Sequence, residues 1–306
     1  MEESASGGRR KKFARPTINS YMYGNAMALA EMNKLAGDEA KAAEYNKEAA
    51  ELKELVENKL WNGKHEFFET LQTDTLANVR EAIGFIPWYF NMPDNKKYDA
   101  AWKQVTDEKG FSAPYGLTTC ERRSPLFRTH GTGTCEWDGA VWPFATSQTL
   151  TAMANYINNY PEPIVGSNEF FHDMEVYVES QHHRGRPYIG EYLDETNGVW
   201  LMGDRERSRY YNHSTFNDLM ITGIIGLRPQ ADGSIIVNPL VPEGKWDYFC
   251  LDNVMYHGKN ISVSTTRPVL TIATARVSSC LSTARRWHSG TRSENLNINY
   301  SYRYSQ

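Results

Sequence analysis

Hydrophobic residues recur at every third or fourth position through the first part of the chain. Between residues 38 and 60 the apolar positions repeat with a period of about 3.6, which predicts an amphipathic helix. Residues 16–37 precede it, with Pro16 suited to a first helical turn and Gly37 typical of a helix end. Because almost no sequence separates the two helices, they predict a helical hairpin with a very short turn.

Further predicted helices alternate with long loops. Helical patterns cover residues 79–90, 95–105, 140–160, 167–183 and 210–226. The loops at residues 110–137 and 185–209 are rich in polar and aromatic residues. Loops of more than about 12–15 residues inside a compact domain are usually functional or disordered, and the aromatic content favours function. We expect the two loops to converge at one end of an antiparallel helical array.

The pattern changes after residue 227. The stretches "GSIIVNPL", "WDYFCLDNVMYHG" and "NISV" are short alternating or apolar runs bounded by Gly, Pro and Asn, which predict β-strands. The predicted fold is therefore mainly α. Residues 1–228 form a helical domain, residues 229–263 a small C-terminal β segment, and residues 264–306 a tail.

The tail differs in composition from the rest of the chain. Residues 264–293 contain no Asp, Glu or Lys, although the preceding chain uses all three throughout. Two explanations fit this composition. The tail is either a surface strand pair followed by a disordered end, or a stretch in which the reading frame shifts near Val263. In either case we expect the residues after Val263 to pack poorly.

Composition and charge narrow the range of partners. The chain has 306 residues and a formal net charge of -4, which gives no reason to expect nucleic acid or an anionic membrane as a partner. No run approaches the roughly 20 apolar residues of a membrane span, and no signal peptide opens the sequence. The four cysteines lack CxxC spacing, so we expect isolated buried thiols, no metal site and no cofactor.

The segment "CEWDGAVW", residues 135–142, combines bulky rings with acids in a short loop ahead of a helix. A loop that only connects two helices needs turn-forming residues. A loop that lines a sugar site needs flat apolar faces for pyranose rings and carboxylates for hydroxyl groups. We therefore predict that Trp137 and Trp142 form part of a sugar-binding wall, and that Glu136 and Asp138 bind hydroxyls.

Glycoside hydrolysis also needs two carboxylates, about 6.5–9.5 Å apart for inversion and about 5 Å apart for retention. Three segments next to predicted helix ends offer acids: "MEESASGG", "CEWDGAVW" and "RPYIGEYLDETNGVW". A single acid in a loop is usually solvated. Glu191 and Asp138, however, have aromatic neighbours in sequence, which favours a place in a pocket.

Three segments together resemble the second half of the six-hairpin (α/α)6 glycosidases, in particular the group that contains processing α-glucosidase I and mannosylglycerate hydrolase. In that group W-x-G-P-x-W opens an inner helix, E-x-Y-x-x-x-T-G carries the general base, and a G-I-x-G helix end closes the barrel. The matching positions in this chain are Trp137, Gly139, Trp142, Glu191, Tyr192, Gly198, Gly223, Ile224 and Gly226. The resemblance covers residues 15–260.

The resemblance implies part of an (α/α)6 toroid, followed by the small β segment, in a glycosidase that cleaves an α-linked sugar with inversion. Glu191 would be the general base that activates water. Glu2 stands in the place of the family's general acid. The substrate would be an oligosaccharide or another glycoside, bound by Glu136, Trp137, Asp138, Trp142, Tyr192 and His213.

The chain departs from the family pattern at three positions. Asp138 stands where the family often has Arg, Ala140 where it has Pro, and Glu2 where it has Asp, so substrate contacts need not carry over. A six-hairpin toroid also needs more helices than the pattern predicts, which suggests the C-terminal half of a larger enzyme. Its location is then open, and would be periplasmic or secreted if an upstream part carries a signal peptide.

Two other classes of function stay open on the sequence. The first is a non-catalytic, carbohydrate-binding half barrel that keeps the cleft without a complete set of acids. The second is a polysaccharide lyase or an epimerase built on an α/α toroid. A lyase needs a Tyr, His or Lys base beside an Arg, and Tyr210, Tyr211 and His213 are the candidates.

Overall fold

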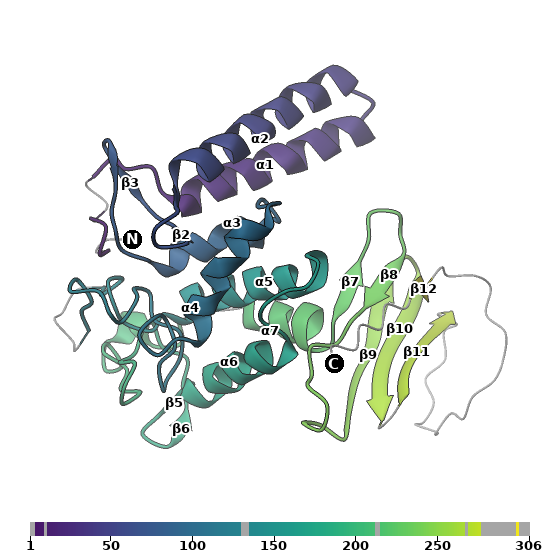
Figure 1. Cartoon of the computed structure of the whole chain (residues 1–306). Helices are drawn as coiled ribbons and strands as arrows, with labels where there is room; N and C mark the ends of the chain where they lie inside the picture. Colours follow the sequence, from purple (N-terminus) through teal and green to yellow (C-terminus); the bar gives the residue numbers. More distant parts are fainter. Residues whose placement is uncertain are drawn as a thin grey trace. The chain divides into compact units, whose positions relative to one another are not determined.

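The computed structural model describes residues 4–8, 11–129, 135–211, 215–266, 269–276 and 298–299, with side chains as far as residue 265. The chain divides into two compact units, Met1–Thr215 and Phe216–Gln306. The first unit is mainly helical, and the described part of the second is built mostly of strands (Figure 1). The mainly helical character predicted from the sequence is confirmed.

Helices α1 (Pro16–Leu35) and α2 (Glu39–Lys59) form the predicted hairpin (Figure 1). Pro16 occupies the first turn of α1, where a missing N–H costs no hydrogen bond. The Asp38 side chain caps α2 by accepting a hydrogen bond of 3.0 Å from the Lys41 N–H. Between the helices, Gly37 has a φ of +81°, a backbone conformation that favours glycine.

Two small hairpins follow, formed by β1 (Trp61–Asn62) with β2 (Phe67–Phe68), and by β3 (Leu71–Gln72) with β4 (Thr75–Leu76). An isolated bridge between Ala14 and Leu71 joins the second hairpin to the segment that leads into α1. The start of α1 and the end of α2 therefore lie on the same side of the first unit.

The helix predicted over residues 79–90 is wrong in its first half. Glu81 is extended, with φ -124° and ψ 148°, and forms an antiparallel bridge with Cys120. A 3₁₀ turn, η1 (Ala82–Phe85), and a single α-turn, α3 (Ile86–Tyr89), come after it. Pro87 provides no N–H for an earlier carbonyl, so a helix running through it would lose a hydrogen bond.

The helix predicted over residues 95–105 is also different in kind. It consists of a 3₁₀ helix, η2 (Lys96–Trp102), that continues into the short helix α4 (Lys103–Thr106). Its role is to supply aromatic side chains to the core. The ring of Trp102 stacks on Tyr156 at 5.1 Å, with 10° between the planes.

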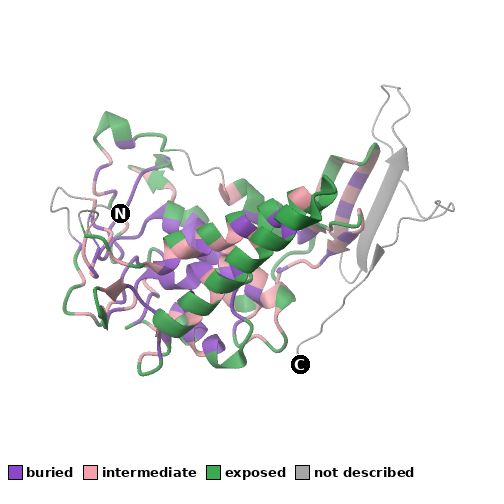
Figure 2. Cartoon of the chain, turned by 90° about the horizontal axis from the view of Figure 1, so that it is seen from above, coloured by how far each residue is buried: buried purple, intermediate pink, exposed green. Residues whose placement is uncertain are grey.

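Much of the aromatic content of the chain lies in this core. The largest fully buried side chains include Phe67, Phe68, Phe85, Trp88, Trp102, Phe111, Tyr156, Phe170 and Phe171. Figure 2 shows the buried residues as purple ribbon among the helices and loops of the first unit. The aromatic content of the chain fits either a large core or an aromatic cleft, and many of these rings lie in the core.

Helices α5 (Pro143–Asn159) and α6 (Ser167–Ser180) pack against each other. The predicted bounds are each within three residues of these ends. α5 begins directly after the loop segment that contains Trp142, and α6 leads into the second long loop. That loop contains the hairpin β5 (His182–His183) and β6 (Arg186–Pro187) and the 3₁₀ turn η3 (Glu206–Ser208).

The helix predicted over residues 210–226 is shorter and irregular. Tyr210 has a φ of 58°, outside the helical region. The helical part comprises α7 (Thr215–Leu219) and a π-helical turn, η4 (Met220–Ile224). Gly226 then turns the chain with a φ of +74°, and a Cβ there would lie 2.0 Å from the Asn238 carbonyl oxygen. Only glycine fits this close approach of two backbones.

The described residues of the second unit form two three-stranded sheets. β7 (Leu227–Pro229) pairs antiparallel with β8 (Ile235–Val237), and β12 (Ile298–Asn299) pairs parallel with β8. The other sheet is a meander of β9 (Tyr248–Tyr256), β10 (Lys259–Thr266) and β11 (Val269–Arg276). Val263 lies inside β10 and is fully buried, so the predicted boundary at this residue falls within a paired strand. In the described residues, no helix has the length and apolar character needed to span a bilayer.

Candidate active site

The two long loops of the first unit meet through a ladder of backbone bridges. The Tyr115 N–H of the first loop donates a hydrogen bond of 3.2 Å to the Glu195 carbonyl oxygen of the second. Val141, four residues after the first loop as predicted, exchanges two hydrogen bonds of 3.0 Å with Leu193. The ladder continues on one side from Leu193 to Trp200, and on the other from Val141 to Thr118. The predicted convergence of the two loops is confirmed.

Three aromatic rings are stacked across this junction. The Trp137 and Trp142 rings lie 4.2 Å apart with 19° between their planes, and Trp142 lies 4.8 Å from Tyr192 with 12° between the planes. Trp142 is 3% exposed and Tyr192 1% exposed, whereas Trp137 is partly exposed. Of the three rings predicted to bind sugar, only Trp137 therefore has an accessible surface, and it stacks on Trp142, which in turn stacks on Tyr192.

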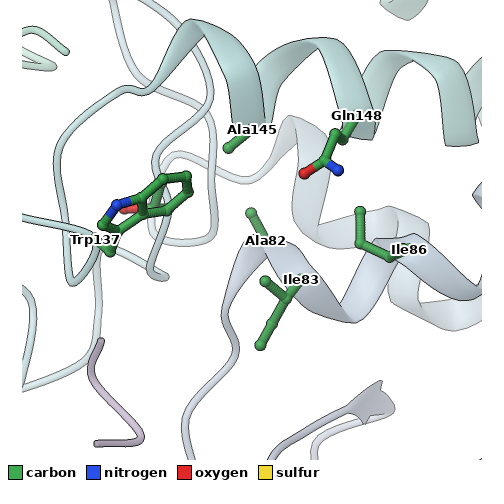
Figure 3. Close-up of a pocket in the computed structure, with 7 residues that line it drawn as sticks. Ala82, Ile83, Ile86, Trp137, Ala145 and Gln148 are labelled. Atoms are coloured by element: carbon green, nitrogen blue, oxygen red, sulfur yellow. The ribbon is translucent and has the colours of Figure 1, made fainter. Parts of the chain in front are cut away.

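Trp137 lines a small, partly open depression (Figure 3). Its other walls come from the η1–α3 segment, the start of α5 and the loop before residue 120. They are Ala82, Ile83, Ile86, Thr119, Ala145 and Gln148. The lining is mostly apolar, with a hydroxyl and an amide as its polar groups. The depression thus combines apolar side chains with two groups that can form hydrogen bonds.

Gln148 is the most prominent polar group of this depression, and Figure 3 shows its amide projecting from α5. Its Nε2 donates a hydrogen bond to the Tyr21 hydroxyl on α1. Burial raises the pKa of the Tyr21 phenol, with a further increase from Tyr89, so the hydroxyl stays protonated at neutral pH. This contact fixes the Gln148 amide through its nitrogen, and it does not involve the carbonyl oxygen of that amide.

Glu191 lies in the second loop, directly before Tyr192, and is 8% exposed. The fully buried Ser208 donates a hydrogen bond of 2.5 Å from its Oγ to the Glu191 Oε2. The preceding Gly190 packs so closely on Trp200 that a Cβ would lie 2.2 Å from the indole ring. The carboxylate is therefore held by a loop that is itself tightly packed.

The neighbouring acids of the same loop have mainly structural contacts. Asp194 Oδ1 accepts hydrogen bonds from the Thr196 N–H and hydroxyl and from the Asn197 N–H, at 2.9, 2.6 and 3.1 Å. These bonds close a turn, as Asp side chains commonly do. Glu195 is buried, and its main-chain carbonyl accepts a hydrogen bond from the Tyr115 N–H.

Asp138 and Glu136 differ in their surroundings. Asp138 Oδ2 lies 2.8 Å from Arg128 Nη2, while Oδ1 is buried and accepts no hydrogen bond from the described residues. Burial raises the pKa of the Asp138 carboxyl, and the Arg128 guanidinium opposes this shift. Glu136 is fully buried with a φ of 50°. Its side chain must therefore move before it can reach a sugar hydroxyl.

One buried acid near the depression gave no signal in the sequence analysis. Glu81 directly precedes Ala82 and Ile83, which line the depression, and its carboxylate accepts a hydrogen bond from Ser6. In the sequence, Glu81 lies in the helix predicted over residues 79–90 and does not differ from other polar positions of that helix. The contact joins residues that are 75 positions apart, which no local pattern could have indicated.

Two predicted site residues, Glu2 and His213, lie outside the described residues. Tyr210 and Tyr211, the candidates for a lyase base, are both exposed. Within the described part of the chain, no group of three or more His, Cys, Asp or Glu could hold a metal ion. The expectation of buried thiols is confirmed for Cys120 but not for Cys135, which is half-buried, and it is wrong for Cys250, which is exposed on the edge strand β9. Cys280 lies outside the described residues.

Comparison with known proteins identifies related domains. Residues 2–214 match the family model described as "Mannosylglycerate hydrolase MGH1-like glycoside hydrolase domain". A solved structure named "Sialidase" is 65% identical, with a TM-score of 0.87 over 90% of this chain and 26% of that chain. A GH63 mannosylglycerate hydrolase from Thermus thermophilus, in complex with Tris and D-glycerate, is 18% identical, with a TM-score of 0.48 over 61% of this chain and 41% of that chain. This chain thus spans only a minor part of either protein.

Proposed function

Because the chain belongs to the MGH1-like glycoside hydrolase family, we propose that it forms part of an inverting glycosidase that cleaves an α-linked sugar. The observation that carries this proposal is the junction of the two long loops. There a partly exposed Trp137 faces the depression, and a ring stack and a backbone ladder connect it to the loop that holds Glu191. Inverting hydrolysis uses one carboxylate as base and a second carboxyl group as acid. Glu191 is proposed as the base, and Trp137 as the platform on which the sugar stacks.

In the proposed reaction a water molecule attacks the anomeric carbon and gives a proton to Glu191. The bond between that carbon and the leaving oxygen breaks, its electron pair moves to the oxygen, and the oxygen takes a proton from Glu2. Each group of this kind contributes roughly 10²–10⁴-fold to the rate. Ser208 occupies Glu191 Oε2, which leaves Oε1 to accept the proton from water.

The remaining predicted residues have supporting roles in this proposal. Trp137 stacks on the sugar. Asp138 Oδ1, which is shielded from solvent and accepts no hydrogen bond from the described residues, accepts one from a sugar hydroxyl after the side chain moves. Trp142 and Tyr192 support the Trp137 ring, while Glu136 and His213 form hydrogen bonds to sugar hydroxyls in the complex with substrate. The substrate class is an oligosaccharide or a glycoside.

We propose that the helices belong to an (α/α)6 toroid with its active site at the loop end. Two features support this arrangement. In the α1–α2 hairpin, irregular segments adjoin the start of α1 and the end of α2. In the α5–α6 pair, irregular segments likewise adjoin the start of α5 and the end of α6. Bridges between those segments, from Ala14 to Leu71 and from Val141 to Leu193, bring them together.

The test is hydrolysis of a panel of aryl and unactivated α-glycosides, with aryl uronides for comparison. NMR of the first product formed from an α-glycoside should show the β-anomer, because single displacement inverts the anomeric carbon. An α-anomer would overturn the inverting mechanism. Unsaturated products from uronides would favour the lyase, and sugar binding without any turnover would favour the non-catalytic carbohydrate-binding alternative.

A further inference from the structure

The described N-terminal segment, residues 4–8, is attached to the core of the first unit through Glu81. Ser6 is 1% exposed, and its Oγ donates to Glu81 Oε2 while its backbone N–H lies 3.4 Å from Oε1. The buried Thr70 hydroxyl takes part in the same cluster, 3.0 Å from Ser6 Oγ and 3.5 Å from Glu81 Oε2. A short stretch of surface sequence thus reaches a carboxylate that is 3% exposed.

Arg15, just before α1, holds the same segment from the other side. Its Nη1 donates to Ser4 Oγ at 3.2 Å and to Ser6 Oγ at 3.3 Å, and its Nη2 donates to the Gly7 carbonyl oxygen. The Gln72 amide adds a hydrogen bond of 2.6 Å to the Ser6 carbonyl oxygen. Both main-chain polar groups of Ser6 are therefore bonded, and the segment is fixed in one conformation.

Glu81 directly precedes Ala82 and Ile83, which line the depression. It forms the bridge with Cys120, and the N–H of the next residue, Ala82, donates to the Thr119 carbonyl oxygen at 2.9 Å. Ala82 and Thr119 both line the depression under Trp137. A movement of Glu81 would therefore change both the wall of the depression and the position of residues 4–8.

A buried carboxylate in this place is costly for stability alone. Removing a carboxylate from water disfavours its charged form, and burial raises the pKa of the Glu81 carboxyl. The Ser6 hydrogen bonds and, after them, the positive charge of Arg15 oppose this shift. No described residue forms a direct salt bridge with Glu81. An apolar residue would fill the same space without this cost, so the specific contact to Ser6 calls for a functional explanation.

We propose that Glu81 is a positioning residue which, through Ser6, holds residues 4–8 next to the wall of the sugar site and thereby anchors the chain directly after the proposed general acid. This inference rests on the proposed function, in which Glu2, two residues before Ser4, supplies the proton to the leaving oxygen. Proton transfer needs the acid within hydrogen-bonding reach of that oxygen. Misplacement of a catalytic group by about 1 Å can cost about 10²-fold in rate.

The test compares substrates that differ in their need for an acid. A glycosyl fluoride has a leaving group that needs little protonation, whereas an alkyl glycoside of the same sugar depends on it. Glu81→Gln should lower kcat on the alkyl glycoside by about 10–100-fold, with KM nearly unchanged, and leave turnover of the fluoride within about threefold. Ser6→Ala, which removes the hydroxyl with little change in volume, should show the same selectivity.

The matched control is Glu69→Gln. Glu69 is 1% exposed and is bonded to Asn62, His65 and Asn78, with no hydrogen bond to residues 4–8. It reports the effect of neutralising a buried carboxylate without releasing the segment. If Glu81→Gln slows both substrates equally, or does no more than Glu69→Gln, the positioning role is overturned.

A second measurement does not depend on activity. Hydrogen exchange of the amides in residues 4–8 should become faster in Glu81→Gln and Ser6→Ala than in Glu69→Gln, at equal Tm. Unchanged exchange would overturn the attachment itself. If the unmodified chain hydrolyses neither substrate, the proposed function and the catalytic purpose of Glu81 are both rejected. Hydrogen exchange then still decides whether Glu81 holds the segment.

Discussion

The indole of Trp142 lies parallel to the ring of Tyr192, with 4.8 Å between the centroids and 12° between the planes. The two rings come from different long loops, and the backbone bridge between Val141 and Leu193 lies directly beside them in sequence. The indole Nε1 of Trp142 also donates a hydrogen bond of 2.9 Å to the Cys135 carbonyl oxygen. This ring is therefore the structural link between the loop that carries Trp137 and the loop that carries Glu191.

Trp142 and Trp137 should differ in what their replacement costs. Trp142→Ala should lower the free energy of unfolding by about 3–5 kcal/mol, because it removes a buried ring and leaves a cavity. Trp137→Ala should cost less stability, since the ring is partly exposed, but should weaken sugar binding by about tenfold or more. Urea unfolding and binding titration with the substrate sugar measure the two effects. Equal stability losses would contradict the assignment of Trp142 as support and Trp137 as platform.

Replacement of Glu191 tests the general base. Glu191→Gln keeps the shape and the hydrogen bond from Ser208, but removes the group that accepts a proton from water. In a protein that hydrolyses a glycoside, the change should lower kcat by at least about 10²-fold and leave sugar binding within a few-fold. Steady-state kinetics measures the change in kcat, and titration of the inactive variant with the sugar measures the change in affinity.

The control for this experiment is Glu195→Gln, together with Glu136→Gln. Both side chains are buried, and both should cost less turnover than Glu191→Gln, because they are assigned binding or structural roles. Near-normal turnover by Glu191→Gln would move the base elsewhere. Asp194 is the next acid in the loop, although its Oδ1 already accepts three hydrogen bonds within the turn.

The parts of the fold that sequence patterns predicted are those set by local periodicity. The α1–α2 hairpin, α5 and α6 have long repeats with clear ends, and their bounds agree within a few residues. The segment before Pro87 could not be read in this way. Its apolar residues suit a helix, but pairing of Glu81 with Cys120, far along the chain, keeps it extended.

The candidate site shows the same limit at the level of side chains. Acids beside aromatic residues correctly indicated loops that meet in space, since Trp137, Trp142 and Tyr192 form one stack. The sequence could not tell which ring faces outward, because burial depends on contacts between the loops. It also gave no sign of Glu81, whose partner Ser6 comes from another part of the chain.

The Arg128–Asp138 pair predicts a stability effect that depends on pH. Asp138 is buried and Arg128 half-exposed, so Arg128→Gln should cost about 1–3 kcal/mol at neutral pH, between the values of exposed and buried pairs. The burial that already raises the pKa of the Asp138 carboxyl then acts without the opposing guanidinium. The loss should shrink as the pH falls and Asp138 takes up a proton. Urea unfolding over a pH series measures this trend.

The double variant Arg128→Gln with Asp138→Asn provides the control for that pair. Once Asp138 is neutral, removal of Arg128 should cost little at any pH, and the coupling between the two changes gives the interaction directly. A cost for Arg128→Gln that is the same at all pH values, and unchanged by Asp138→Asn, would show that Arg128 stabilises the loop by packing alone.

Asp173 on α6 predicts a second pH dependence, with its own range. Its Oδ2 is shielded from solvent and accepts no hydrogen bond from the described residues. Burial, and after it the negative charge of Glu169, raises the pKa of the Asp173 carboxyl from 3.8 to about 8. A group whose pKa is higher in the folded state binds its proton more tightly there. Protonated Asp173 therefore contributes to the free energy of unfolding in full below pH 3.8, its pKa in the unfolded chain. This contribution is lost as the pH rises from there towards 8, its pKa in the folded chain.

Asp173→Asn keeps a neutral side chain of similar shape at every pH, so it should not lose this contribution. Its Tm should match that of the unmodified chain near pH 4 and exceed it by at least about 2 °C at pH 8, the shift that about 1 kcal/mol produces in a domain of this size. Thermal unfolding followed by circular dichroism across this range measures the difference. Glu179→Gln, an exposed change on the same helix, should give a curve parallel to that of the unmodified chain. If the curve for Asp173→Asn is also parallel to that of the unmodified chain, the Asp173 carboxyl is hydrated in solution. Its charge then does not limit the stability of the first unit at neutral pH.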